Sequence, residues 1–496
     1  MKIPADNLPD DIAELKKMVL ALQSRCHFLE EQFRLAQHQQ FGKNSERSTA
    51  QDDCFNEAEQ TLDEAVAVEK TAINTVRQKP KRKPLPKDLP REVVIHDMTD
   101  EEKVCDDCGG ELHCIGEDKS EQLEFIPAQV KVIENTRPKY ACRGCEKTAT
   151  GVLIKQAPAP ASPIAKSMAT PSLLSQIITS KYQYSLPLYR QEQLFQQHGI
   201  DLNRKTMSEW ILKCATLSQP IIDYWHELLL QQPVIQADET TLKVIGEDKA
   251  RCYMWLYCTG TDSPQESSLP NIVLYDYQAS RSGQCAVDFL QSFQGYLQAD
   301  GYKGYEQTQA KLAGCWAHAR RKFIEAEKAQ GKNKTGKANW AISHIRKLYR
   351  IETQIKDLSP NQKMIERKEK ALPLLKQLKS WLDKSVNQVP PKSAIGKAIG
   401  YSLNQWDKLI LYTENGNLNI DNNRAERAIK PLVIGRKNWL FANTASGARA
   451  SATLYSLIET AKANGLIPFD YLMFLLSELP KKQSDIESLM PWNFKR

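Results

Sequence analysis

Three runs of strand-forming residues follow one another near the middle of this 496-residue chain and constrain its fold most strongly. They begin at Pro233 and read PVIQADETTLKVI, RCYMWLYCTG and NIVLYDYQAS, all rich in residues that favour strands. A helical segment, CAVDFLQSF, comes next, and two shorter strand-like runs, GYLQADGYKGY and KLAGCWAH, follow it. Strands that alternate with helices in this way predict an α/β core, which we place at residues 233–445.

The second half of this core contains a long helical segment. Residues from about 319 to 415 are rich in charge and show helical periodicity, as in ARRKFIEAEKA and IRKLYRIETQIKDL. They predict a helical insertion between the last strand and the next helix of the core. Residues 446–496 predict a C-terminal helical element. Because a chain of this length exceeds what one hydrophobic core can hold, the predicted fold class is a multidomain α/β protein.

The N-terminal residues 1–42 carry a heptad repeat. Apolar residues recur at alternating steps of three and four: Ile12, Leu15, Val19, Leu22, Cys26, Leu29, Phe33 and Ala36. This pattern predicts a coiled coil that joins copies of the chain into a homo-oligomer, and the alternative is one amphipathic helix packed on another domain. Residues 43–90 are polar and end in the basic, proline-rich RQKPKRKPLPKDLPR, which indicates a linker.

Composition limits the location of the protein. The sequence has no apolar run of about 18 residues, and its N-terminus lacks a signal-peptide pattern, so we expect a cytoplasmic protein without a membrane partner. In that reducing compartment, the twelve cysteines are better searched for metal ligands than for disulfides. The net charge of +7 permits nucleic-acid binding without requiring it.

Four cysteines have the spacing of a zinc site. They form two C-x2-C pairs, Cys105 with Cys108 and Cys142 with Cys145, separated by a strand-like stretch. Each pair directs two thiolates at one point, and two pairs complete a tetrahedral set. We therefore predict a zinc ribbon at residues 91–156 that holds one structural Zn²⁺, since four protein ligands leave no open position.

Residues 165–232 have the pattern of a helical DNA-binding region. Gly199 marks a tight turn between two helical segments, and Asn203 is suited to cap the second of them. Arg204 and Lys205 open that second helix and are predicted to contact DNA, as in a helix-turn-helix. An ordinary helical hairpin is the alternative. The three predicted helices span residues 171–181, 186–197 and 203–216.

Three carboxylates are the candidate catalytic residues. Asp238 and Asp300 are expected at the ends of two strands, and Glu426 lies on the helix that follows the insertion. Together they can hold Mg²⁺ (or Mn²⁺), which prefers oxygen ligands and supports phosphoryl transfer. Taken singly, an Asp before Gly is often a turn and a Glu beside Arg is often a surface pair. Glu239 also competes with Asp238 for the role.

The helix that carries Glu426 lies in the basic sequence DNNRAERAIKPLVIGRKN. Asn422, Asn423, Glu426 and Lys430 are predicted to share one face, and Pro431 is predicted to end or kink the helix. Cations in and before this region are predicted to contact the DNA backbone, namely Arg320, Arg321, Arg427, Lys430, Arg436 and Lys437.

Cys315 and His318 are spaced like half of a metal site. The sequence shows no second half near them. We therefore expect them to be structural residues near the active centre.

With these motifs in place, the sequence resembles the insertion sequence 66 family of DDE transposases over nearly its whole length. The matching stretches include CDDCGGELHCIGEDKSEQLEFIP with YACRGC, ADET, QADGYKGY, GCWAHARRKF, NNRAERAIKPLVIGRKNWLF and SGARASATLYSLIETAKANG. The resemblance implies an RNase H-like catalytic core with Asp238, Asp300 and Glu426 as its acidic triad. It also implies a zinc module, a helix-turn-helix-like segment and small accessory proteins as partners. Asp106 stands where this family often has proline, and both thiol pairs are retained.

The function expected from this resemblance is DNA transposition in the nucleoid. The protein would bind the terminal repeats of a mobile element, cleave there with a metal-bound triad, and join the ends to target DNA. Two alternatives belong to other classes. One is a catalytically silent DNA-binding regulator derived from a transposase, and the other is a metal-dependent nuclease that cuts without joining.

Overall fold

The computed structural model describes residues 11–41, 130–141, 154–249, 251–260, 270–329, 336–481 and 485–494. The chain divides into two compact units, one formed by Met1–Glu64 with Pro158–Arg496 and the other by Ala65–Ala157. In the second unit, β1 (Lys139–Ala141) and β2 (Ile154–Gln156) pair antiparallel. The four predicted zinc cysteines and the predicted linker lie outside the described residues.

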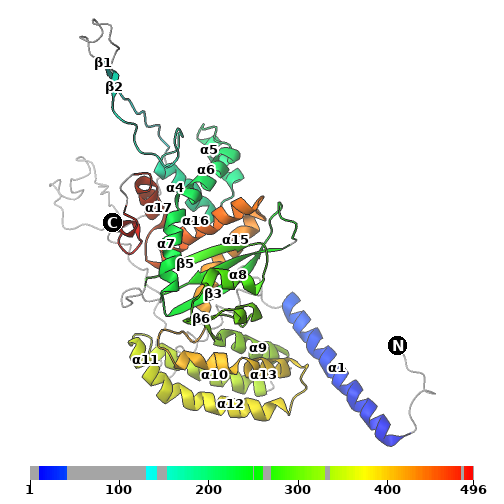
Figure 1. The fold of residues 1–496 in the computed structure, drawn as a ribbon. Coiled ribbons are helices and arrows are strands. Elements are labelled where there is room, and N and C mark those ends of the chain that lie inside the picture. Colours follow the sequence, from blue (N-terminus) through cyan, green and yellow to red (C-terminus); the bar gives the residue numbers. More distant parts are fainter. Residues whose placement is uncertain are drawn as a thin grey trace, which may run out of the picture. The chain divides into compact units, whose positions relative to one another are not determined.

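A mixed five-stranded sheet forms the centre of the larger unit (Figure 1). The first three strands are antiparallel neighbours, whereas the last two run parallel to β3, so the sheet order is β5-β4-β3-β6-β7. This arrangement confirms the predicted α/β class. The strands are β3 (Val234–Leu242), β4 (Cys252–Cys258), β5 (Val273–Gln278), β6 (Tyr296–Gln298) and β7 (Lys311–Ala313).

Helices cover the faces and one edge of this sheet. The short α8 (Gly283–Leu290) packs on β4, where Phe289 stacks on the ring of Tyr257 at 3.9 Å. Next to it lies α7 (Gln219–Leu230), and His226 Nε2 lies 2.8 Å from the carbonyl oxygen of Phe289. A 3₁₀ turn, η2 (Lys303–Gln307), follows β6.

The long helix α16 (Ala445–Ala463) lies along the outer edge of β5. Its side chains form hydrogen bonds with backbone groups of that strand. Ser456 Oγ accepts a hydrogen bond from the Tyr275 N–H at 2.8 Å. Thr460 Oγ1 accepts from the Val273 N–H and donates to the carbonyl oxygen of the same residue, both at 3.0 Å. The exposed row of backbone groups that an edge strand would otherwise present is therefore occupied.

Between β7 and the final core helix, the chain forms the helical insertion. Figure 1 shows its helices gathered as one bundle, and the bundle has its own apolar core, which includes Phe323, Ile345, Leu348, Leu378 and Ile399. Its helical segments are α9 (Trp316–Ala329), α10 (Lys337–Gln354), α11 (Pro360–Glu366), the π-helical η3 (Arg367–Ala371), α12 (Leu372–Val386), α13 (Ala394–Asn404), α14 (Trp406–Ile410) and η4 (Leu411–Thr413).

After the insertion, α15 (Asn423–Trp439) returns to the sheet and packs on β3 and β4. It continues through Pro431, so this proline does not end the helix, and the other predicted outcome, a kink, stays a prediction. A proline removes one backbone donor from a helix. Hydrogen bonds from the side chains of Arg424 and Arg436, near the two ends of α15, stabilise the helix against that loss.

The helical region before the core forms close to where it was predicted, as α4 (Pro171–Tyr182), α5 (Leu188–Gln197) and α6 (Arg204–Leu217). The Asn203 side chain accepts a hydrogen bond from the Thr206 N–H at 2.9 Å, which confirms the predicted cap. Gly199 has a φ of +74°, the left-handed conformation that a tight turn requires and glycine adopts without strain.

The two ends of the chain are helical within the described residues. Near the C-terminus, α17 (Pro468–Glu478) packs on α4, and the short η5 (Glu487–Leu489) follows. At the N-terminal end, α1 (Ile12–Phe41) is one continuous helix with an exposed apolar seam that includes Ile12, Val19, Leu29 and Phe33. No helix in the described part of the chain is both long enough and apolar enough to span a membrane.

The insertion is held together by one buried guanidinium. Arg367 is 2% exposed, and its Nε and Nη2 donate to the two carboxylate oxygens of Glu352 at 2.9 and 2.6 Å. Its Nη1 donates to the carbonyl oxygens of Tyr412 and Asn415. One side chain thus connects α10 to the end of the insertion.

Arg367→Ala should therefore lower the free energy of unfolding of the insertion by about 3–5 kcal/mol, because it leaves a largely buried carboxylate and two carbonyls without their donor. Denaturant unfolding followed by tryptophan fluorescence measures this, since Trp340 and Trp381 stack within the insertion at 4.6 Å. Lys379→Ala, which removes an exposed ion pair with Asp383, is the matched control and should cost less than about 1 kcal/mol. Equal shifts for the two variants would contradict the prediction.

Candidate catalytic and metal-binding site

The register of the parallel strands places Asp238 and Asp300 side by side. β3 and β6 pair as far as Gln236 with Gln298, and the two aspartates come two residues later on their respective chains. Residues two apart in an extended chain point to the same face, so both carboxylates emerge beside each other. The prediction that Asp238 ends its strand is wrong, because β3 continues to Leu242 through its pairing with β4.

The next parallel strand, β7, places Cys315 beside the two aspartates. β6 pairs with β7 as far as Gln298 with Ala313, and Cys315 follows two residues later. From there the chain enters α9, whose first turn carries His318. The carboxyl ends of parallel strands are where ligands bind in open α/β sheets, and the register brings Asp238, Asp300 and Cys315 to that end.

Helix α15 places Glu426 near Asp238, Asp300 and Cys315. Asn422, immediately before the helix, donates through Nδ2 to the carbonyl oxygen of Ala237 at 2.8 Å. Its backbone N–H donates to the Cys315 sulfur at 3.2 Å. Glu426 follows one turn later and is only 7% exposed. A single residue therefore docks the start of the helix on both β3 and the segment after β7.

Burial and neighbouring acids raise the pKa values of Asp238 and Glu426. Burial, followed by the charges of Glu426, Glu239 and Asp300, holds the pKa of Asp238 well above its usual range. Burial raises the pKa of Glu426 to about 7, with Asp421 and Asp300 adding to the rise and Arg321 opposing it. Such a set costs free energy when it is ionised, and a divalent cation with a preference for oxygen ligands would remove that cost.

Glu239, next to Asp238 in the sequence, has its own hydrogen-bond partners. Tyr305 donates its hydroxyl to Glu239 Oε2 at 2.7 Å, and Arg281 donates through Nε and Nη2 to Oε1 at 2.9 and 2.5 Å. The Arg281 guanidinium also lies over the ring of Tyr302 at 4.1 Å. Because Glu239 is already neutralised by these contacts, the geometry favours Asp238 over Glu239 as the acid that faces a metal ion.

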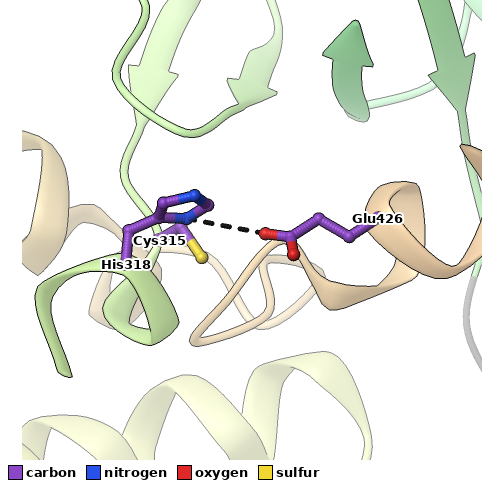
Figure 2. Close-up of side chains that lie close together, drawn as sticks. All are labelled: Cys315, His318 and Glu426. Carbon is purple, nitrogen blue, oxygen red and sulfur yellow. Dashed lines mark ion pairs between the residues drawn. The ribbon is translucent and has the colours of Figure 1, made fainter. Parts of the chain in front are cut away.

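Glu426 has two nitrogen neighbours from α9. His318 Nδ1 lies 3.5 Å from Glu426 Oε1, and Arg321 Nη2 lies 3.8 Å from Oε2. Figure 2 shows the first of these contacts, with the Cys315 sulfur beside the imidazole ring. Burial, followed by the charge of Arg321, lowers the pKa of His318 to about 4. The imidazole is therefore neutral at pH 7, with a lone pair available.

The predicted DNA-contacting cations fall into two groups. Arg204, Lys205, Arg427 and Lys437 are exposed, and Lys430 is half-buried. Arg320 is only 8% exposed, so the structure places it in the interior rather than at a DNA-facing surface. Arg436 donates through Nη1 to Thr240 Oγ1 at 2.8 Å and to Thr241 Oγ1 at 3.2 Å, which ties the end of α15 to β3.

Arg424 is a further structural cation that the sequence did not single out. It is 9% exposed and donates through Nε to the carbonyl oxygen of Thr259 and through Nη2 to Asn271 Oδ1, at 3.1 and 3.0 Å. Its signal in the sequence, an Arg beside an Asn and an acid, is shared by surface residues and so could not have identified it.

The comparisons with known proteins agree with this architecture. The family model described as "Transposase IS66 family" matches residues 166–450, and the model of the zinc-finger binding domain of transposase IS66 matches residues 102–146. Two further models match residues 28–94, described as "Transposase C of IS166 homeodomain", and residues 456–492, described as "IS66 C-terminal element". The protein is thus of the transposase class. Since the first model spans more than half of the sequence, the chain belongs to the IS66 transposase family.

Relatives match over the full length of the chain. The uncharacterized proteins y4jD and y4qI of Sinorhizobium fredii (strain NBRC 101917 / NGR234) are each 34% identical to it. Both alignments cover 100% of this chain, with 98% of y4jD and 99% of y4qI. A third uncharacterized protein of that strain, y4hP, is 33% identical over 85% of this chain and 78% of its own length. No solved structure matches the chain.

The raised pKa of Glu426 predicts a pH dependence of stability. A carboxyl group whose folded pKa is about 7 and whose ordinary value is 4.5 favours the folded state when it is protonated. That contribution is present below pH 4.5 and is lost as the pH rises through about 7. Relative to Glu426→Gln, the metal-free wild type should lose roughly 3 kcal/mol of unfolding free energy across this interval.

The measurement is denaturant unfolding of both proteins at a series of pH values in the presence of a chelator. The difference between the two curves reports Glu426 together with its interaction with His318 at 3.5 Å, whose lowered pKa acts in the opposite direction over part of the same range. Parallel curves would show that Glu426 is not buried among the other acids.

Proposed function

We propose that this protein is a DDE-type transposase in which Asp238, Asp300 and Glu426 hold Mg²⁺ (or Mn²⁺) for phosphoryl transfer on DNA. The observation that carries the proposal is the convergence of these three carboxylates. Two come from neighbouring parallel strands and one from a helix that returns after the insertion. The mixed sheet, with three antiparallel strands followed by two parallel ones, supports an RNase H-like core.

The donor set fits such a metal ion. Asp238 and Asp300 are half-buried, and Oδ1 of each accepts a backbone N–H, from Glu239 and Tyr302 respectively. Glu426 is buried, and its Oε1 has no hydrogen-bond partner among the described residues. A bound divalent ion supplies charge neutralisation on the phosphate and a lowered pKa for an attacking water. The chain's own residues then position that ion, and Arg321 offsets part of the negative charge beside Glu426.

The remaining parts of the chain support the recognition of DNA. The side chains of Arg204 and Lys205 are exposed in the first turn of α6, where they can contact phosphate. Arg427 and Lys437 are exposed on α15, the helix that carries Glu426. The exposed apolar seam of α1 supports self-association through a coiled coil. We assign one structural Zn²⁺ to Cys105, Cys108, Cys142 and Cys145, within the range matched by the zinc-finger model.

The reaction proposed here has two in-line displacements on phosphorus. Water first cleaves the strand at each end of the element and leaves a 3′-hydroxyl, and that hydroxyl then attacks target DNA. One carboxylate site can serve both steps, because each needs the same stabilisation of the attacking and leaving oxygens. No side-chain nucleophile is required.

Asp238→Asn, Asp300→Asn and Glu426→Gln should each reduce cleavage and strand transfer by at least about 10³-fold, because each removes a ligand of the metal ion. The measurement uses labelled element-end DNA with Mg²⁺, and binding of the same DNA is followed in parallel. All three variants should still bind DNA.

Each possible result assigns the protein to a class. Variants that cut as well as the wild type would refute the triad. A wild type that binds without cutting would favour the regulator, and one that cuts without joining would favour the nuclease. Glu239→Gln serves as the matched control: it removes a neighbouring acid that has its own partners, so it should retain metal-dependent cleavage if the assignment to Asp238 is right.

Lys205→Ala should weaken binding to element-end DNA and lower the slope of log affinity against log salt by about 1, because one phosphate contact is lost. Lys213→Ala is the matched control, since it removes the same charge from an exposed position further along α6. Affinity measured at a series of salt concentrations separates the two. Identical slopes for both variants would refute the contact at the start of α6.

A further inference from the structure

Cys315 and His318, whose metal preferences differ from those of the catalytic acids, lie beside Glu426. One ligand atom each from Cys315, His318 and Glu426 lies within 4.8 Å of the others. Cys315 lies in the segment between β7 and α9, His318 in the first turn of α9 and Glu426 in the first turn of α15. Figure 2 shows the three side chains together. Sulfur and imidazole ligands select zinc-like ions, whereas magnesium prefers oxygen. We propose that Cys315, His318 and Glu426 form a second metal site that binds a thiophilic divalent cation such as Zn²⁺.

The separations suit a single small ion. Two ligand atoms on one tetrahedral zinc lie about 3.3–3.6 Å apart, as follows from zinc–ligand bonds of about 2.0–2.3 Å. His318 Nδ1 and Glu426 Oε1 are already 3.5 Å apart. The thiol of Cys315 needs to move by no more than about 1 Å to complete the set. Three protein ligands leave a fourth position for water, so the site is an open one rather than a closed structural one.

The polar atoms that face this point lack other partners. Glu426 Oε1 and His318 Nδ1 are both buried, and neither has a hydrogen-bond partner among the residues that the structure describes. Buried polar atoms without partners are rare in folded proteins, because each carries a desolvation cost. The Cys315 sulfur is 1% exposed and accepts a hydrogen bond from the Asn422 N–H. On binding the ion, the thiol releases its proton to solvent.

This site competes with the catalytic one for a shared ligand, an inference that rests on the proposed role of Glu426. The second metal site takes Glu426 Oε1, and Arg321 lies 3.8 Å from the other oxygen. Zinc on Oε1 and the Arg321 guanidinium near Oε2 would both repel an Mg²⁺ ion at this carboxylate. Zinc should therefore inhibit DNA cleavage by withdrawing one of three acids, and Cys315 and His318 should set the zinc concentration at which this occurs.

The first test measures metal content and needs no activity. Full-length wild type should hold about one zinc ion per chain more than Cys315→Ser or His318→Ala, beyond the ion assigned to the zinc finger. Titration with Co²⁺ gives a second readout, since a thiolate bound to cobalt absorbs in the near ultraviolet, and the difference spectrum between wild type and Cys315→Ser should show this band. Cys285→Ala, at another buried cysteine, is the matched control and should keep both signals.

Asp300→Asn separates this site from the catalytic one, because it removes a proposed Mg²⁺ ligand that is not among the three ligands of the second site. It should abolish cleavage and retain the additional zinc. If Asp300→Asn loses the zinc, or if Cys315→Ser and His318→Ala both keep it, the second site is refuted. Circular dichroism identifies a variant that fails to fold, and His318→Gln then replaces His318→Ala.

The second test adds zinc to cleavage reactions that contain Mg²⁺, with each protein normalised to its own zinc-free rate. Half-inhibition should shift to higher zinc by about tenfold or more in Cys315→Ser. An unchanged zinc response would refute the competition. A wild type that binds the additional zinc but never cleaves DNA would refute the proposed function and leave the metal site standing.

Discussion

The whole site depends on how the chain returns to β3 after the helical insertion. Asn422 fixes the start of α15 by donating two hydrogen bonds, one to the Ala237 carbonyl oxygen in β3 and one to the Cys315 sulfur beyond β7. Arg424 and Arg436 then tie the two halves of α15 to the sheet. These contacts stabilise the placement of Glu426 against the electrostatic cost of bringing it near two other acids. Without them the carboxylates would repel one another and the helix would move away.

The strands and the helices could be predicted from the sequence because each leaves a local pattern, whereas the role of the three acids stays a prediction. Apolar runs mark the strands, and Asn203 marks the start of α6 through its capping chemistry. Asp238 was identified by its residue type, although its predicted place at a strand end was wrong. The pairing of β3 with β4, which extends the strand, is a long-range interaction that no local pattern records.

Contacts between distant segments could not be predicted. Cys315 and His318 have the spacing of half of a metal site, but the sequence favours a structural role for them, because Glu426, which lies next to them in space, comes on a helix beyond the entire insertion. The roles of Arg320 and Arg436 also depended on the fold, because an arginine that faces solvent and one that is buried have the same local sequence signal. Pro431 shows the same limit, since the anchors of α15 on the sheet override the local tendency of proline to end a helix.

The hydroxyl groups of Ser456 and Thr460 have a consequence for how copies of this protein can meet. By occupying the backbone of β5, they close that side of the sheet to any added strand. A second copy cannot extend the sheet there, so association at that edge has to occur between helices. The same two positions accept few substitutions. An alanine at either position would leave a backbone N–H of β5 without its hydrogen-bond acceptor. Serine and threonine are the replacements that keep this hydrogen bond.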